Sequence, residues 1–540
     1  MLSARPALIA SFALLALVVI SLAVTVSRSS ATHGGYWHTT EIASVASDGT
    51  VADSGSAPEG RPLQLSEDGR FVVFSSDARN LVSGFGGVFL RDRATDTTEL
   101  VSVADDGTPA NGGGSYPDIT PDGRYVVFGS FTATLVPGDT NGKPDIFIRD
   151  RVAGTTRRVS LGMGGAEGNG ESNFPDISEN GRFVVFSSDA TNLVPGDTND
   201  QPDLFLRDLQ TSATERISVA TDGTQANGES DVGFVSDDGR FIVFESEASN
   251  LVPGDTNDNW DAFLRDRQLG ATTRISLSST GAQLPEGSFP SDMTPDGRFV
   301  LLDMRSDGVV PGDANGSPDA FLLDRQTGAL ELVSTGLAQW GDGRSYPGAL
   351  SGDARFVAFS SHATNLVAGD TNGNSDVFVY DRATGVTEIA SIRPDGSGDD
   401  QSSDSPGISG DGRVVAYRSW AVLFPQDTNG VHDVLVAVTT GPAPIPARWG
   451  DFDCLNGITI GDAQKIARDL IDIPVTQGPG CPAPGAEVTV DGTPRMWGDL
   501  DCQNGVTIGD AQKTARDLID LPVSQADGCP RPGDSIQVQS

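Results

Sequence analysis

One unit of sequence recurs at near-constant spacing along most of this chain, and this repeat constrains the fold more than any other feature. A loop aspartate marks each copy, at Asp139, Asp197, Asp255, Asp313, Asp370 and Asp427. Such a regular period indicates repeated supersecondary units that bury their apolar faces against one another. The chain is therefore expected to form one large repeat structure and not several unrelated domains.

Four short β-strands are predicted for each copy. In the most distinct one, a Gly-Arg or Ala-Arg pair leads into a β-branched and aromatic run such as Phe71-Val-Val-Phe74, which is typical of a buried strand. The Asp-Gly or Asn-Gly step before the run predicts a tight turn with glycine at positive φ. Seven such starts occur, at Arg70, Arg124, Arg182, Arg240, Arg298, Arg355 and Arg413. Together these units predict a mainly β fold, a seven-bladed β-propeller over residues 39–440.

The two ends of the repeat array complement each other. The last copy has the strand of residues 433–438 and then gives way to a Pro-rich linker at residues 441–447, so it lacks a fourth strand. Residues 39–46 match residues 97–104, which form the fourth strand of the next copy. We therefore expect the N-terminal segment to pair beside residues 433–438 and to close the ring, which removes exposed edge strands.

The repeat resembles the WD-like propeller repeats of the TolB type, which also occur in tricorn-type and prolyl-oligopeptidase-type proteins. The resemblance covers about residues 39–438 and is carried by Pro121-Asp-Gly-Arg-Tyr-Val-Val-Phe128 and its copies. It implies a propeller fold but no particular activity, because propellers host many unrelated functions. The sequence contains no Gly-x-Ser-x-Gly nucleophile motif of the hydrolase type.

Six of the seven copies carry the loop pattern Asp-x-Asn-x-x-x-Asp, which places oxygen atoms at alternate positions of a tight loop. This chemistry suits Ca²⁺, which takes roughly six to eight oxygen ligands. The alternative is a plain turn, since Asp and Asn initiate turns by hydrogen bonding to their own backbone. The first copy has Ser83-Gly-Phe-Gly-Gly87 here and is expected not to bind. The candidate ligands are Asp139, Asn141 and Asp145; Asp197, Asn199 and Asp203; Asp255, Asn257 and Asp261; Asp313, Asn315 and Asp319; Asp370, Asn372 and Asp376; and Asp427, Asn429 and Asp433.

A different repeat begins at Trp449 and starts again at Trp497. Each copy has a 12-residue loop with acids at positions 1, 3 and 12, followed by a one-sided apolar stripe that predicts a short amphipathic helix. The pair resembles the dockerin repeat, and this resemblance implies an α-helical module at residues 448–540 that binds Ca²⁺ and docks on a cohesin-like partner. The implied ligands are Asp451, Asp453, Asn456, Thr459 and Asp462, and in the second copy Asp499, Asp501, Gln503, Thr507 and Asp510.

All four cysteines lie in this C-terminal region, at Cys454, Cys481, Cys502 and Cys529. The separation of Cys454 from Cys481 equals the separation of Cys502 from Cys529. This equality favours the disulfides Cys454–Cys481 and Cys502–Cys529 over the other two connectivities. A zinc site is the alternative, but the cysteines do not form the close pairs that zinc sites use.

The N-terminal residues predict export. Arg5 precedes an apolar run over residues 7–26, and residues 29–31 offer small side chains for cleavage, so residues 1–31 are typical of a secretory signal peptide. The run is also long enough to span a bilayer, so a retained membrane anchor is the alternative. In either form the remaining chain lies outside the cytoplasm, secreted or at the cell surface, where disulfides persist.

The composition limits the choice of partners. The chain has 36 Lys and Arg against 74 Asp and Glu, a net charge of −38, which argues against nucleic acid as a ligand. We therefore predict an exported, non-catalytic binding or scaffold protein, with a protein or glycan ligand at the propeller face. The alternative is a secreted hydrolase acting on polysaccharide or peptide, because a glycosidase needs only two facing carboxylates.

Overall fold

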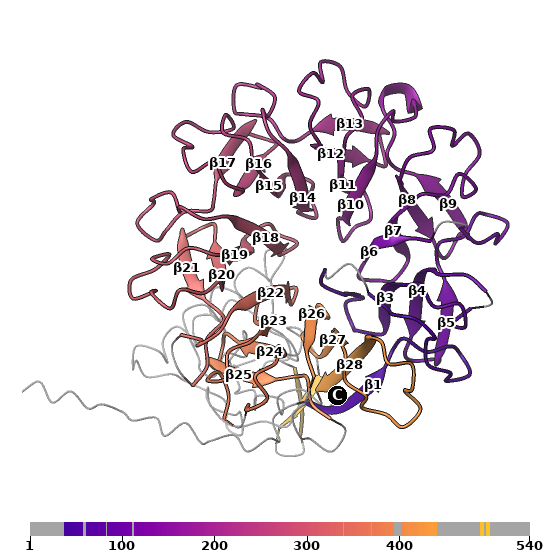
Figure 1. Cartoon of the computed structure of the whole chain (residues 1–540), viewed down its shortest axis with the longest axis vertical. Helices are drawn as coiled ribbons and strands as arrows, with labels where there is room; N and C mark the ends of the chain where they lie inside the picture. Colours follow the sequence, from indigo (N-terminus) through magenta and orange to yellow (C-terminus); the bar gives the residue numbers. More distant parts are fainter. Residues whose placement is uncertain are drawn as a thin grey trace, which may run out of the picture.

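Seven four-stranded antiparallel sheets surround a common axis as the blades of a ring (Figure 1). The computed structural model describes residues 37–57, 61–82, 84–110, 113–337, 340–368, 370–393, 401–439, 487–490 and 493–496. In this part of the chain the only helical element is the short 3-10 turn Met163–Gly165, and no helix is long and apolar enough to cross a membrane. The predicted seven-bladed propeller is confirmed.

The strands of each blade run from the axis outward in chain order (Figure 1). Blade 1 contains β2 (Gln64–Leu65), β3 (Phe71–Ser76), β4 (Gly87–Asp92) and β5 (Thr97–Leu100). Blade 2 contains β6 (Ser115–Ile119), β7 (Tyr125–Ser130), β8 (Asp145–Asp150) and β9 (Thr155–Arg158). Blade 3 contains β10 (Ser172–Ile177), β11 (Phe183–Ser188), β12 (Asp203–Asp208) and β13 (Ala213–Arg216). Blade 4 contains β14 (Ser230–Val235), β15 (Phe241–Ser246), β16 (Asp261–Asp266) and β17 (Ala271–Arg274).

The remaining blades repeat this order, except that the last one takes its outer strand from the N-terminus. Blade 5 contains β18 (Ser288–Met293), β19 (Phe299–Met304), β20 (Asp319–Asp324) and β21 (Ala329–Leu332). Blade 6 contains β22 (Ser345–Leu350), β23 (Phe356–Ser361), β24 (Asp376–Asp381) and β25 (Val386–Ile389). Blade 7 contains β26 (Ser403–Ile408), β27 (Val414–Ser419), β28 (Asp433–Thr439) and β1 (Trp37–Ile42).

The ring closes through β1, as the sequence predicts. This strand pairs antiparallel with β28, so that Thr39 lies opposite Val438 and Ile42 lies opposite Leu435. Beyond the strand, the backbone N–H of Ala43 donates to the carbonyl of Val434 at 2.8 Å. The N-terminal segment therefore supplies the fourth strand that the last repeat lacks.

The second and third strands form the buried centre of every blade. In blade 2, Val126 and Phe128 belong to the core shared with blade 1, whereas Val127 belongs to the core shared with blade 3. Phe128 lies opposite Phe147, and their rings stack with centroids 6.0 Å apart. Burying one such side chain stabilises the fold by roughly 1.5–3 kcal/mol. The apolar runs that mark the repeat thus hold neighbouring blades together.

The turn before the second strand requires the glycine that the sequence pattern marks. Gly239 has a φ of +66°, and a Cβ at this position would lie 2.6 Å from the Phe183 ring of the preceding blade. Blade 6 is the exception, because Ala354 adopts a φ of 55° at the equivalent position. Both the backbone conformation and the close packing between blades therefore select glycine in the other six copies.

Parts of the sequence prediction fall outside the described residues. They are the signal or anchor at residues 1–31, the linker at 441–447, and the calcium loops, helices and disulfides of residues 448–540. Within that C-terminal region the structure describes one antiparallel hairpin, β29 (Glu487–Val490) with β30 (Thr493–Met496). This hairpin is not predicted from the sequence, and it falls between the two loop repeats.

Candidate functional site

Three aspartates on the innermost strands point to a common region near the ring axis. Asp118, Asp176 and Asp292 each follow a register shift in β6, β10 or β18, where the first strand of the blade deviates from regular pairing with the second. Such β-bulges redirect side chains and are frequent beside functional sites. The repeat thus places carboxylates at the axis in blades 2, 3 and 5.

These carboxylates hydrogen-bond to the next blade. Asp118 Oδ2 accepts from the backbone N–H of Ile177 at 2.8 Å, and Asp292 Oδ2 accepts from that of Leu350 at 2.7 Å. Asp176 accepts in the same way from blade 4, at 3.0 Å. The three aspartates therefore clamp neighbouring innermost strands together around the axis, which is a structural use of their oxygens.

A cavity of about 140 Å³ lies on the axis and is lined by innermost strands of all seven blades. Its acidic residues are Glu67, Asp118, Asp176, Glu179 and Asp292, and among the described residues its lining contains no Lys, Arg or His. Burial raises the pKa of Glu179 and of Asp292 to about 7, with further increases from neighbouring carboxylates. Burial also raises the pKa of Asp118 to about 6. A cation entering this cavity would stabilise the charged carboxylates and lower these pKa values.

A second cavity of about 30 Å³ adjoins the first, since Asp118, Asp176 and Phe234 line both. Arg61 and Tyr116 contribute to its wall. The Arg61 guanidinium lies over an aromatic ring of blade 3, 5.4 Å from the centroid of Phe174, and the same ring packs against Tyr116 at 4.6 Å. The axis therefore has an acidic part and a part that combines aromatic rings with one cation.

The six Asp-x-Asn loops lie elsewhere, between the second and third strands of blades 2–7. The last aspartate of each loop is the first residue of the third strand. Its carboxylate accepts hydrogen bonds from the loop asparagine or from a serine that follows the fourth strand. In blade 2, Asn141 Nδ2 is 3.3 Å and Ser160 Oγ is 2.5 Å from the Asp145 carboxylate. All six of these aspartates are buried: Asp145, Asp203, Asp261, Asp319, Asp376 and Asp433.

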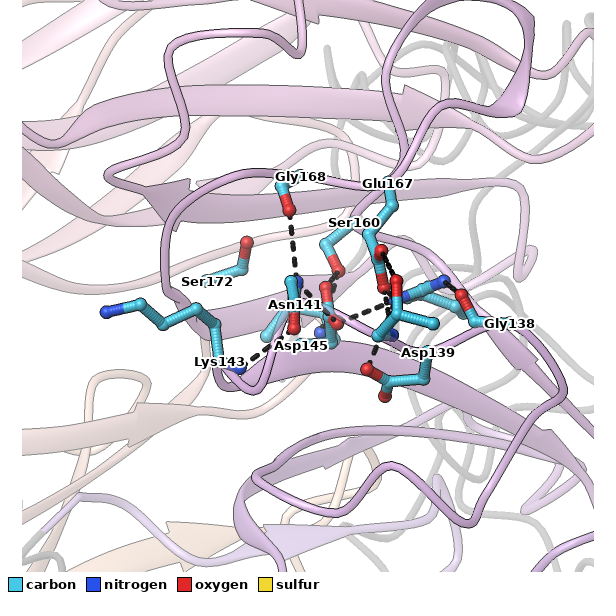
Figure 2. A network of polar contacts seen from close by, with 12 residues as sticks. Gly138, Asp139, Asn141, Lys143, Asp145, Ser160, Glu167, Gly168 and Ser172 are labelled. Atoms are coloured by element: carbon cyan, nitrogen blue, oxygen red, sulfur yellow. Dashed lines mark hydrogen bonds and ion pairs between the residues drawn. The ribbon is translucent and has the colours of Figure 1, made fainter.

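Three acidic side chains lie close together here: Asp139 and Asp145 of blade 2, and Glu167 of the connection to blade 3 (Figure 2). Their oxygens come within 4.8 Å of one another, a spacing that would suit a metal ion. An arginine occupies the space between them, however, because Arg158 Nη1 lies 2.9 Å from Asp145, 3.6 Å from Asp139 and 2.6 Å from Glu167. The guanidinium already supplies the positive charge that such a cluster needs.

Blades 3 and 4 repeat this arrangement. Arg216 lies 3.3 Å from Asp197 and 3.0 Å from Asp203. Arg274 lies 3.2 Å and 3.3 Å from the corresponding pair, Asp255 and Asp261. These arginines lie outside the Asp-x-Asn motif and are not among the predicted site residues, although each of them follows the first loop aspartate of its blade at the same spacing.

Blades 5, 6 and 7 lack the arginine. The fourth-strand residue at its register position is Leu332, Ile389 or Ile42, as shown by pairing opposite the third strand. The loop asparagine still donates to the last aspartate, at 2.8 Å from Asn315 to Asp319 and 3.1 Å from Asn429 to Asp433. The six loops therefore form two classes that their shared Asp-x-Asn pattern does not distinguish.

No protein-family model matches the chain, and no curated protein matches it in sequence. Solved structures with a similar fold include TolB from Acinetobacter baumannii, at 16% identity over 69% of this chain and 81% of that chain, with a TM-score of 0.33. An oligogalacturonate lyase from Vibrio parahaemolyticus is 12% identical over 74% of this chain and 97% of that chain, with a TM-score of 0.46. An acylaminoacyl peptidase from Pyrococcus horikoshii is 12% identical over 68% of this chain and 49% of that chain, with a TM-score of 0.43. The names of two of these neighbours state different activities, a lyase and a peptidase.

Proposed function

We propose that this chain is an exported, non-catalytic propeller that binds a basic segment of a protein at the acidic cavity on its axis. The observation that carries the proposal is the lining of that cavity, where the described residues include Glu67, Asp118, Asp176, Glu179 and Asp292 and no basic side chain. In this proposal the C-terminal dockerin-like repeats bind Ca²⁺ and two disulfides staple them. They dock the protein on a cohesin-like partner or stabilise it outside the cell.

The size of the cavity limits what enters it. At about 140 Å³, it is comparable to the apolar cavity of roughly 150 Å³ that accepts benzene in an engineered protein. One lysine or arginine side chain fits this volume, whereas a folded domain does not. The rest of the ligand would lie across the exposed turns that carry Glu67 and Glu179.

The hydrogen bonding at the axis favours binding over catalysis. The carboxyl groups of Asp118 and Asp292 are held by backbone N–H groups of two strands each, so their positions at the axis are fixed. Glu67 and Glu179 lie on turns whose residues are exposed overall, while partial burial of their carboxyl groups raises the pKa of each. An ammonium or guanidinium group placed among these carboxylates would release protons on binding, because it lowers their raised pKa values.

Secreted glycoside or peptide hydrolysis is a second candidate function. It is favoured by one observation: Glu179 and Asp292 line the same cavity, and burial raises the pKa of each to about 7. A carboxyl group that is protonated near neutral pH can act as a general acid. Product formation from a polysaccharide or peptide that is lost in Glu179→Gln would favour this function over the first.

The binding proposal is tested with a fluorescent oligolysine peptide and a neutral oligosaccharide as probes. We expect oligolysine to bind the full chain at low salt, and Glu67→Gln/Glu179→Gln to weaken binding at least tenfold. The matched control is Asp106→Asn/Asp222→Asn, which removes the same charge from fully exposed turns and should bind like wild type. Equal weakening in both double variants, or preferential oligosaccharide binding, would overturn the proposed basic ligand.

A further inference from the structure

The loops of blades 5 and 7 contain a buried carboxylate oxygen that has no hydrogen-bond partner within the described part of the chain. Asp313 is 6% exposed and Asp427 is 5% exposed, and Oδ1 of each is fully covered and unpaired. An unsatisfied buried charged group costs on the order of several kcal/mol unless something compensates for it. These two oxygens therefore indicate that a partner belongs at this position.

The repeat shows where the missing partner would lie. In blades 2, 3 and 4 the equivalent Oδ1 atoms, on Asp139, Asp197 and Asp255, face the arginine guanidinium at distances of 3.6, 3.3 and 3.2 Å. The arginine is replaced by Leu332 in blade 5 and by Ile42 in blade 7. The orphaned oxygens thus belong to the aspartates that contact an arginine in the equivalent position of blades 2, 3 and 4.

A second polar group is also lost in these blades. In blades 3 and 4, Gln225 and Gln283 donate from Nε2 to the first loop aspartate at 2.9 Å. In blade 5 the equivalent residue is Trp340, whose carbonyl accepts from Asn365 Nδ2 as that of Gln225 accepts from Asn250. In blade 7 the equivalent residue is Val51, which bridges to Val45 as Gln225 bridges to Val219. Blades 5 and 7 therefore lack both the arginine and the glutamine that contact the first loop aspartate in blades 3 and 4.

The two acids of each loop nevertheless remain close to one another. In blade 5, Asp319 is 1% exposed, and Asn315, two residues beyond Asp313, donates to it at 2.8 Å. In blade 7, Asp433 is 1% exposed, and Asn429, two residues beyond Asp427, donates to it at 3.1 Å. Two carboxylates that face each other without a cation repel, and a divalent ion between them removes that repulsion.

We propose that blades 5 and 7 each bind one Ca²⁺ between the two aspartates of the Asp-x-Asn loop, at the position that an arginine guanidinium fills in blades 2, 3 and 4. The chain supplies carboxylate oxygens from Asp313 and Asp319, or from Asp427 and Asp433. The side chains of Asn315 and Asn429 donate to the last aspartate and hold it in place, and water completes the shell. The proposal does not depend on the ligand of the axial cavity, and it excludes blades 2–4.

The test is calcium stoichiometry of the full chain by calorimetric titration after chelator treatment. Leu332→Arg introduces the guanidinium of the other class, and Asp313→Asn removes a ligand, so each should lower the number of bound ions by one. Asp197→Asn in blade 3 is the matched control and should leave the number unchanged. Calcium bound in the C-terminal repeats is common to all variants and cancels in this comparison.

Crystals grown with CaCl₂ provide a measurement that needs no variant. Anomalous difference peaks beside Asp313 and beside Asp427 are expected. Absence of both peaks, or a stoichiometry that neither Leu332→Arg nor Asp313→Asn changes, would overturn the proposal. A loss of one ion in Asp197→Asn equal to that in Asp313→Asn would also overturn it, because the arginine would then not separate the two classes.

Discussion

Replacing Arg216 with leucine should expose the energetic role of the guanidinium that bridges a loop of the first class. In wild type its side chain is 11% exposed and contacts Asp197 and Asp203, whose side chains are 3% and 0% exposed. Breaking a buried ion pair by removing one partner typically costs about 3–5 kcal/mol, because a buried charge is left without compensation. Ser218 Oγ still donates to Asp203 at 2.6 Å. We therefore expect Arg216→Leu to lower the free energy of unfolding by about 3 kcal/mol, at the lower end of this range.

The cost should depend on pH in a defined direction. Without Arg216, the charged form of Asp197 is disfavoured by burial and by repulsion from Asp203, so the already raised pKa of Asp197 rises further in the variant. The folded variant then binds a proton that the unfolded chain releases at neutral pH. The loss in the free energy of unfolding of the variant, relative to wild type, should therefore be smaller at pH 5 than at pH 8.

Urea denaturation at both pH values measures this effect. The control is Arg413→Leu, because Arg413 is 59% exposed at its side chain and lies 3.9 Å from Asp411. Such a surface pair contributes little, and we expect a change within about 0.5 kcal/mol. A deficit below about 1 kcal/mol for Arg216→Leu, or a deficit that does not shrink on acidification, would refute the argument that the guanidinium compensates buried charge.

Two further predictions concern the whole propeller. Gly239→Ala should lower the free energy of unfolding by about 1–3 kcal/mol, because the new Cβ meets the Phe183 ring at a φ of +66°. Gly223→Ala has a φ of +87° with no atom within 4 Å, so urea denaturation should show a smaller loss. Acidification from pH 7.5 to 5 should raise wild-type stability, because burial raises the folded-state pKa of Asp292 and Glu179 to about 7, so the folded chain binds more protons. A urea midpoint that falls on acidification would contradict the raised pKa values of Asp292 and Glu179.

The architecture could be predicted from sequence because its determinants are local and repeated. The Gly-Arg and Ala-Arg starts identified the number of blades, and the match of residues 39–46 to residues 97–104 identified β1 as the missing outer strand. Both features depend on patterns within one repeat. Whatever one copy leaves ambiguous, such as the turn before the second strand, the other copies resolve.

The axial site could not be predicted in this way. Asp118, Asp176 and Asp292 are short-range features of a strand end, but their role arises from contact with the next blade and from convergence at the axis. Blade 4 has Phe234 at the position equivalent to Asp176 in blade 3. A search for regularly spaced residues therefore passes over these acids, because they do not recur in every copy.

The two classes of Asp-x-Asn loop show how a repeat can hide functional differences. The loop pattern itself is kept in blades 2–7, since the turn and the buried aspartate at the start of the third strand are needed wherever a blade has this loop. The compensating charge comes instead from the end of the fourth strand, where arginine in three blades gives way to leucine or isoleucine in the other three. Because folding requires the aspartate and not the arginine, the fourth-strand position is free to differ between blades. Differences among copies at such positions, and not the shared loop motif, therefore distinguish blades 2–4, whose loop acids contact a guanidinium, from blades 5 and 7, where we propose a bound cation.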